Sequence, residues 1–426
     1  MNNIQEVKSP RTGDMYYKIN HKSGLTIYVY PKKDYSSTYA IFGTKYGSIN
    51  TTFSVDNGDK ITVPDGIAHY LEHKLFESEE QDAFERFSKT GAQANAYTSF
   101  DRTCYLFSCS DNFEQNFRIL LDFVQHPYFT EETVRKEQGI IGQEINMYDD
   151  SAPWRVLFNL LCAMYKNHPV RIDIAGTVES IANINADLLY DCYNTFYNLN
   201  NMFICVAGNV KAEDVFSICD ELLLDKEKIE IERYMPVEDE SIVNDKVELS
   251  LPVSIPMFAI GFKEKCERPQ KTVKEKVLTE IILKCIFGND SQLYKQLFDS
   301  GLINDNFGTE HFNGFGYESV IVEGESNDPL KVREIINSYI ENIKINGISD
   351  EDIERCKKAY YGKCVSDYNS VENIVSNLVD SAFFDYGVFD EIETLMSITA
   401  NDVNKRLSEI LDVNNSSISI INKKEN

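Results

Sequence analysis

Two histidines and a glutamate lie within one short stretch, residues 66–77, with the sequence GIAHYLEHKLFE. His69 and His73 are two of only six histidines in the chain, and Glu72 directly precedes the second of them. In an α-helix, residues four positions apart project to the same side, so both imidazoles can bind one ion. The spacing therefore predicts a metal site on a helix.

The residue types also indicate which metal would bind and what chemistry it would support. Zinc takes imidazole and carboxylate ligands, and a catalytic zinc keeps one position for water. The order H-x-x-E-H is the inverse of the zincin motif and occurs in zinc proteases. A bound zinc ion lowers the pKa of its water to about 7, and a nearby carboxylate can then remove the proton. Glu72 is therefore the candidate base, with one zinc ion per chain.

Two histidines do not complete such a site, so a third ligand must come from elsewhere. The best candidate is Glu144, on a helix that we expect to begin after Thr130. Glu137 lies seven residues earlier, two helical turns away on the same face, where it could orient a ligand imidazole. The alternative is a surface helix with incidental histidines. The remaining histidines are expected to have turn or packing roles: His21, His126, His168 and His311.

The helix that carries the motif is expected to span residues 63–91 and to begin near Pro64–Asp65. Within it, Ile67, Leu71 and Leu75 have the spacing of a buried helical face. This arrangement would pack one side of the helix against a core and leave the histidines on another.

Composition limits the possible partners and the compartment. The 426 residues include 42 Lys and Arg against 68 Asp and Glu, a formal charge of −26. Such a charge disfavours binding to nucleic acids or anionic membranes. It would keep the protein soluble, or alternatively would line an acidic cavity that attracts basic peptides. No signal peptide or membrane span is evident, and the ten cysteines lack any CxxC pair. These features predict a cytoplasmic protein.

The chain contains a faint internal repeat with an offset of roughly 215 to 219 residues. Residues 129–145 resemble residues 348–364, and residues 180–208 resemble residues 394–422. We therefore expect an α+β fold of two similar domains from a duplication, each an antiparallel-rich sheet packed with helices. The expected boundaries are a metal-binding domain at 1–225, a linker and first strand at 226–250, and a second domain at 251–426.

The second half should hold no metal. Aligning Thr130 with Ser349 places Lys363 opposite Glu144 and Cys356 opposite Glu137, and the second half has no copy of the histidine motif. A lysine cannot replace a carboxylate ligand of zinc.

Five stretches together resemble the pitrilysin/insulinase family of zinc peptidases, and especially its short bacterial members, whose genes often occur as neighbouring pairs. They are GIAHYLEHKLFE, GAQANAYTSFDRTCYLFS, VRKEQGIIGQEINMYDD, HPVRIDIAGTVESIANI and NNMFICVAGNV. The resemblance implies a LuxS/MPP-like metallopeptidase fold, with two subunits around an enclosed chamber. It also implies His69, His73 and Glu144 as ligands and Glu72 as the base. Asn95 and Ala96 would then bind the backbone of a peptide substrate along a sheet edge.

The sequence departs from this family at one place. Active members carry an Arg and a Tyr from the second type of domain, but Phe298 stands where the Arg is expected and Asp305 falls near the Tyr. A homologous partner subunit could supply the pair in a heterodimer, or the chain could be a zinc-binding scaffold with little activity. A third possibility is a homodimeric peptidase that uses other residues.

Overall fold

The computed structural model describes residues 3–79, 81–266, 272–384 and 386–424. The chain forms two compact units, and each unit takes segments from both halves of the sequence. The first unit comprises Met1–Ile145, Asp173–Tyr234 and Val365–Phe389, and the second comprises Asn146–Ile172, Met235–Cys364 and Asp390–Asn426.

The first unit is built around a seven-stranded sheet with the order β1-β2-β3-β9-β4-β8-β7. Neighbouring strands are antiparallel, except that β3 and β9 run parallel. Every residue of β9 is buried, which fits its continuous apolar run between two covered faces. The strands are β1 (Asn3–Lys8), β2 (Met15–Asn20), β3 (Thr26–Pro31), β4 (Thr38–Thr44), β7 (Gln93–Thr98), β8 (Thr103–Cys109) and β9 (Met202–Gly208). A small second sheet consists of β5 (Thr52–Val55), β6 (Ile61–Thr62) and β10 (Ile231–Arg233).

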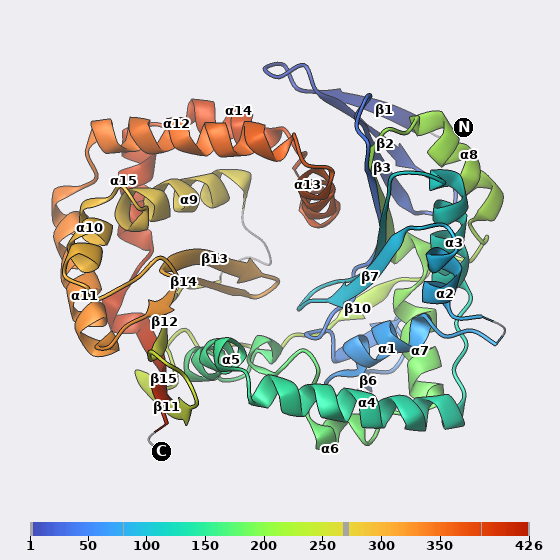
Figure 1. The fold of residues 1–426 in the computed structure, drawn as a ribbon, viewed down its shortest axis with the longest axis horizontal. Coiled ribbons are helices and arrows are strands. Elements are labelled where there is room, and N and C mark those ends of the chain that lie inside the picture. Colours follow the sequence, from blue (N-terminus) through green and yellow to red (C-terminus); the bar gives the residue numbers. More distant parts are fainter. Residues whose placement is uncertain (1–2, 80, 267–271, 385, 425–426) are drawn as a thin grey trace. The chain divides into compact units, whose positions relative to one another are not determined.

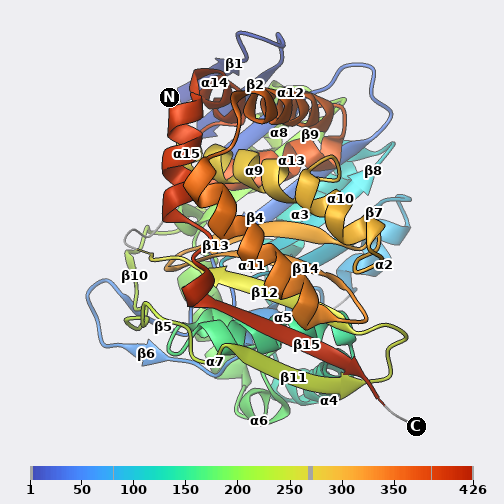
Figure 2. The same ribbon diagram turned by 90° about the vertical axis from the view of Figure 1, so that its left-hand side faces the viewer.

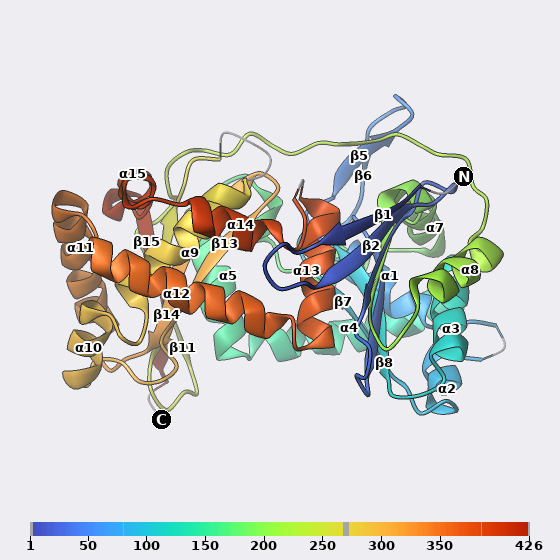
Figure 3. The same ribbon diagram turned by 90° about the horizontal axis from the view of Figure 1, so that it is seen from above.

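Helices cover both faces of the seven-stranded sheet, with α3 and α8 on one face and α13 on the other (Figure 1 and Figure 3). The ring of Phe383 in α13 packs edge-on against Phe203 of β9, with 5.6 Å between the centroids. Tyr28 of β3 donates a hydrogen bond to the Ser381 carbonyl on the same face. The helices are α1 (Ile67–Leu75), α2 (Ala83–Ser88), α3 (Phe113–Gln125), α4 (Glu131–Asp149), α6 (Val178–Ile181), α7 (Ala186–Phe196), α8 (Ala212–Leu222) and α13 (Val371–Phe383), with a 3₁₀ turn at Leu199–Asn201.

The second unit contains a five-stranded sheet with the order β11-β15-β12-β14-β13. The strands are β11 (Lys246–Leu251), β12 (Met257–Lys263), β13 (Gly308–Gly314), β14 (Tyr317–Glu325) and β15 (Ser416–Lys423). Figure 2 shows β11 and β15 side by side, and this pair is parallel while the other pairs are antiparallel. The helices are α5 (Ala152–Met164), α9 (Val273–Phe287), α10 (Gln292–Asp299), α11 (Pro329–Asn346), α12 (Asp350–Asp367), α14 (Asp390–Ser397) and α15 (Ala400–Glu409), with 3₁₀ turns at Pro169–Arg171 and Val413–Asn415.

The two sheets share one topology. The strands β3, β9, β4, β8 and β7 have the same order and relative directions as β11, β15, β12, β14 and β13. The predicted α+β fold with two similar domains is therefore confirmed.

The equivalent helices α5 and α13 are exchanged between the two halves of the sequence. Helix α5 belongs to the first half but packs on β12 and β15, and α13 belongs to the second half but packs on β4 and β9. The compact units therefore do not coincide with continuous stretches of the sequence. The predicted domain boundaries at residues 225 and 251 remain a proposal about where the two sequence repeats begin and end.

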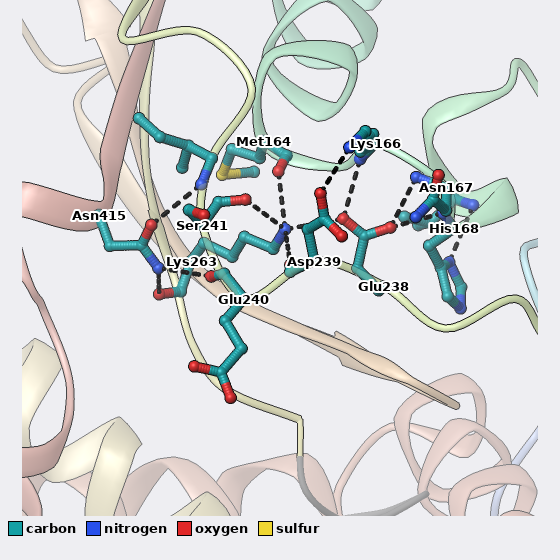
Figure 4. A network of polar contacts seen from close by, with 12 residues as sticks. Met164, Lys166, Asn167, His168, Glu238, Asp239, Glu240, Ser241, Lys263 and Asn415 are labelled. Atoms are coloured by element: carbon teal, nitrogen blue, oxygen red, sulfur yellow. Dashed lines mark hydrogen bonds and ion pairs between the residues drawn. The ribbon is translucent and has the colours of Figure 1, made fainter.

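The segment predicted as a linker is partly structured. Its residues Ile231–Arg233 form β10, which pairs with β5, and β11 begins at Lys246. Figure 4 shows how residues 238–241 are held within the second unit by Lys263. The Lys263 ammonium lies 2.7–3.1 Å from the carbonyl oxygens of Met164, Asp239 and Ser241, and 2.8 Å from Glu238 Oε1.

The carboxylate of Glu238 has further partners in the same network. It accepts hydrogen bonds from the main-chain N–H groups of Lys166, Asn167 and His168. Burial alone would raise the pKa of Glu238, but Lys263 and these donors lower it to about 2. The ion pair between Lys263 and Glu238, in which both groups make several further hydrogen bonds, therefore anchors the predicted linker.

None of the helices in the described part of the chain combines the length and apolar character needed to cross a membrane.

Candidate metal centre

The helix that carries His69 and His73 is shorter than predicted. Helix α1 spans Ile67–Leu75 rather than residues 63–91, and α2 follows as a separate helix. The side chain of Asp82 accepts a hydrogen bond from the Phe84 N–H at 2.7 Å and so begins a new helix. At the other end, Gly66 has a φ of +88°, and a Cβ there would lie 2.3 Å from the Ala175 carbonyl oxygen. Only glycine fits this start.

Two faces of α1 have different roles. Ile67, Leu71 and Leu75 are buried in the core, as the spacing predicted. The rings of His69 and His73 lie side by side with 4.6 Å between their centroids. The helical spacing therefore brings both imidazoles to one place.

Helix α4 brings a carboxylate to the same place. Thr130 caps its start through a hydrogen bond from the Thr133 N–H, at the predicted position, and Tyr70 of α1 donates a hydrogen bond to the Val134 carbonyl of α4. Glu144 Oε1 lies 3.7 Å from His69 Nε2, and Glu144 Oε2 lies 3.4 Å from His73 Nε2. The structure thus brings His69, His73 and Glu144 together from two separate helices.

Glu137 contacts the other nitrogen of one ring. Its Oε1 lies 3.0 Å from His73 Nδ1. The carboxylate therefore fixes the orientation of the His73 ring and leaves Nε2 directed at Glu144.

The two imidazoles differ in their affinity for protons. Burial, together with the neighbouring His73, lowers the pKa of His69 to about 4. Burial would also lower the pKa of His73, but hydrogen bonds to Glu137 and Glu144 outweigh it and raise the pKa to about 10. The hydrogen bond to His73 lowers the pKa of Glu137 in turn. In the metal-free chain, His69 is neutral and His73 carries a proton between two carboxylates.

The donors fit zinc. Two imidazole nitrogens and one carboxylate form a common ligand set, and zinc bonds of about 2.0–2.2 Å in a tetrahedron separate the ligand atoms by roughly 3.3–3.6 Å. The distances of 3.4 and 3.7 Å from Glu144 to the two Nε2 atoms are close to this range. Donor atoms of His69, His73 and Glu144 all lie within 4.8 Å of one another.

Glu72 lies beside these residues and is held by a residue that the sequence did not single out. The Thr98 hydroxyl of β7 donates a 2.5 Å hydrogen bond to Glu72 Oε2. Burial raises the pKa of Glu72, although Thr98 and His73 oppose this effect. A raised pKa suits a group that takes up a proton near neutral pH.

Asn95 and Ala96 lie on the same strand, β7, which is the edge of the sheet. The Ala96 N–H donates a 2.9 Å hydrogen bond to the side-chain oxygen of Asn95. Residues alternate along the strand, so Ala96 shares a face with Thr98, while Asn95 is exposed on the other.

Three of the remaining histidines have local partners. His21 lies 2.8 Å from Asp220, and His168 lies 3.0 Å from the Phe315 carbonyl oxygen. His126 is exposed and lies 2.8 Å from the Asp122 carbonyl oxygen.

His311 belongs to a second group of possible metal donors, together with Glu264 and Glu318. A cation already compensates the two carboxylates, because Arg406 Nη2 lies 2.8 Å from Glu264 and 3.1 Å from Glu318. We interpret this group as a buried ion network of the second unit rather than a metal site.

Comparison with known proteins identifies relatives over nearly the whole chain. Residues 55–178 match the domain described as insulinase (peptidase family M16), and residues 183–360 match the peptidase M16 inactive domain. The "uncharacterized zinc protease YmfH" of Bacillus subtilis is 41% identical and covers 95% of this chain and 96% of its own. The crystal structure of a putative M16-like peptidase from Alicyclobacillus acidocaldarius is 33% identical, with a TM-score of 0.92 and 99% coverage of both chains. A protease from Helicobacter pylori, 18% identical, shares the fold with a TM-score of 0.80 over 99% of this chain and 100% of its own.

A two-unit α+β fold with an H-x-x-E-H helix beside a carboxylate defines a metallopeptidase of the inverted zinc-motif class. The chain belongs to the insulinase family, peptidase family M16. The family resemblance read from the sequence is thereby confirmed, and the prediction of a metallopeptidase is confirmed at the level of the family.

Proposed function

We propose that the chain is the zinc-binding subunit of a cytoplasmic metalloendopeptidase that hydrolyses peptides or small unfolded proteins in an enclosed chamber. The observation that carries this proposal is the convergence of His69 Nε2, His73 Nε2 and the Glu144 carboxylate, with Glu72 beside them. Two relatives from Bacillus subtilis are named as zinc proteases, which supports the choice of metal.

In this proposal His69, His73 and Glu144 hold one zinc ion, and Glu137 orients the His73 ring. The ion, when bound, supplies a Lewis acid that polarises the scissile carbonyl and makes water more acidic. Glu72 takes the proton from the attacking water and delivers it to the leaving amine. The hydrogen bond from Thr98 to Oε2 leaves the other carboxylate oxygen, Oε1, for this proton.

The edge strand β7 is proposed to bind the substrate as an added strand. Such pairing recognises the peptide main chain and places few demands on its side chains. Asn95 and Ala96 would contact the peptide backbone, with the Asn95 amide as a side-chain partner. The Asn95 side-chain oxygen accepts a hydrogen bond from the Ala96 N–H, and its NH2 group can donate to a peptide carbonyl.

A homologous partner subunit is proposed to complete the site. The sequence has no arginine between Arg268 and Arg333. Phe298 stands where the family resemblance expects an Arg, and Asp305 falls near the expected Tyr. Phe298 is 43% exposed on α10 and stacks on Tyr294. Neither residue can donate hydrogen bonds from its side chain to an oxyanion at neutral pH, so a partner chain would supply these donors.

The same observation favours a second candidate, a zinc-binding assembly subunit without turnover. Purified chain, alone and mixed with the product of a neighbouring homologous gene, separates the two. We expect about one zinc per chain by elemental analysis, weak cleavage of a quenched peptide alone, and strong cleavage in the mixture.

Glu72→Gln tests the assignment of the base. We expect it to keep zinc and lose cleavage, whereas the exposed control Glu85→Gln on α2 should keep both. Absence of zinc would refute the proposed metal centre, and zinc without cleavage in any mixture would favour the assembly subunit. Strong cleavage by the single chain would exclude the need for a different partner.

A further inference from the structure

The residue that contacts Glu72 from β7 is Thr98, the last residue of that strand. Its Oγ1 lies 2.5 Å from Glu72 Oε2, which is the range of a strong hydrogen bond to a charged oxygen. Glu72 is buried, and Thr98 provides the one hydrogen bond to its carboxylate that is resolved among the described residues. The orientation of this carboxylate therefore depends on a single hydroxyl group.

The hydroxyl of Thr103, next to Thr98, helps to decide which group donates the hydrogen in the contact between Thr98 and Glu72. Thr103, the register partner of Thr98 on β8, donates its hydrogen to the Tyr46 carbonyl oxygen at 2.9 Å. A threonine hydroxyl has one hydrogen, so Thr103 has none left for Thr98, 3.4 Å away. An ionised Glu72 carries no hydrogen either. The Thr98 hydroxyl must therefore donate to Glu72 whenever the glutamate is ready to act as a base.

The geometry also assigns different tasks to the two carboxylate oxygens. Glutamate has three rotatable side-chain torsions, and its last torsion is broad, so the carboxylate plane is not fixed by the helix alone. Donation from Thr98 engages Oε2 and fixes the plane. Proton transfer is then left to Oε1, in one orientation.

We propose that Thr98 is a positioning residue that holds the Glu72 carboxylate in its reactive orientation. This inference rests on the proposed function, in which Glu72 is the base. Thr98 lies two residues beyond Ala96 on the same face of β7, so one strand would both bind the peptide and orient the base.

Three variants of the full-length chain test this role, each assayed with its partner subunit if one is needed for turnover. Thr98→Val keeps the shape and removes the hydroxyl; we expect kcat to fall about 10- to 100-fold, with KM and bound zinc unchanged. Thr98→Ser restores the hydroxyl and should return kcat to within about threefold of the wild type. Thr44→Val is the matched control, because Thr44 is buried in β4 of the same sheet and donates to the Phe196 carbonyl at 2.6 Å. It should lower the melting temperature without changing kcat.

A crystal structure of zinc-loaded Thr98→Val provides a readout that does not depend on turnover. We expect the Glu72 carboxylate to leave its wild-type orientation or to occupy several, and to return to it in Thr98→Ser. An unmoved Glu72, or a kcat within threefold of the wild type, would overturn the proposal. Loss of zinc, or a defect that serine does not restore, would also overturn it, because the role would then be structural. If the wild type binds zinc but never cleaves, the proposed function fails, and the orientation of Glu72 still decides the role of Thr98.

Discussion

Glu137 Oε1 lies 3.0 Å from His73 Nδ1, on the side of the ring that faces away from Glu144. A carboxylate in this position orients an imidazole ligand and increases its basicity. Glu137→Gln keeps the size of the side chain but removes the charge. We expect zinc affinity to fall about 10- to 100-fold, measured by competition with a chelator. Glu132→Gln, in the exposed first turn of the same helix, should leave the affinity unchanged; an equal effect of both changes would contradict the assigned role.

Zinc binding should release about one proton. The pKa of His69 is about 4 and that of His73 about 10, so at pH 8 only His73 must lose its proton to bind the metal. Because the pKa of His73 is raised above 6.5, its protonated ring stabilises the metal-free fold fully below pH 6.5 and loses this contribution as the pH rises through about 10. Zinc affinity should therefore rise about tenfold per pH unit between roughly 6.5 and 10. Calorimetry of zinc binding in two buffers of different ionisation enthalpy measures the number of protons released. Equal binding enthalpies in the two buffers would contradict the prediction.

Lys263 should be essential for the stability of the second unit. Its ammonium is buried among three carbonyl oxygens and Glu238, and removing one partner of a buried ion pair typically costs about 3–5 kcal/mol. We expect this loss in the free energy of unfolding of Lys263→Met. Trp154, the chain's single tryptophan, lies in α5 of this unit and reports unfolding by fluorescence in urea. The exposed Lys295→Met should change the stability by less than about 0.5 kcal/mol; similar losses in both variants would argue against the network.

Asn95 should affect substrate binding more than turnover. Removing one hydrogen bond to the peptide backbone costs about 1 kcal/mol, so Asn95→Ala should raise KM roughly 3- to 10-fold with a smaller change in kcat. Gln93→Ala is the matched control, since Gln93 is also exposed and lies on the same face of β7. Steady-state kinetics with a quenched peptide decide the point, and an unchanged KM for Asn95→Ala would exclude the contact.

The sequence allowed the main parts of the metal centre to be predicted because they depend on helical spacing. His69 and His73 are one turn apart, and Glu137 and Glu144 are two turns apart, so each pair stays on one face of its helix wherever the helix packs. The two similar domains with antiparallel-rich sheets were also expected, since the two halves repeat their order of elements.

Other features depend on contacts between distant segments and could not be read in this way. The hydrogen bond from Thr98 requires the register of β7 against α1, which spacing along the chain does not determine. The break between α1 and α2 was missed because residues 77–82 are polar and acidic, as in many exposed helices, and Asp82 instead begins a new helix. The position of α13 on the first sheet has no local signal, since an amphipathic helix fits either sheet.

The exchange of α13 has a consequence for how the protein is made. Phe203 and Tyr28 lie in the first half of the sequence, yet their partners Phe383 and Ser381 are synthesised some 180 to 350 residues later. One apolar face of the first sheet therefore stays without the helix that covers it until residues 371–383 have left the ribosome. Exposed apolar surface of this kind makes an incompletely folded chain prone to aggregate.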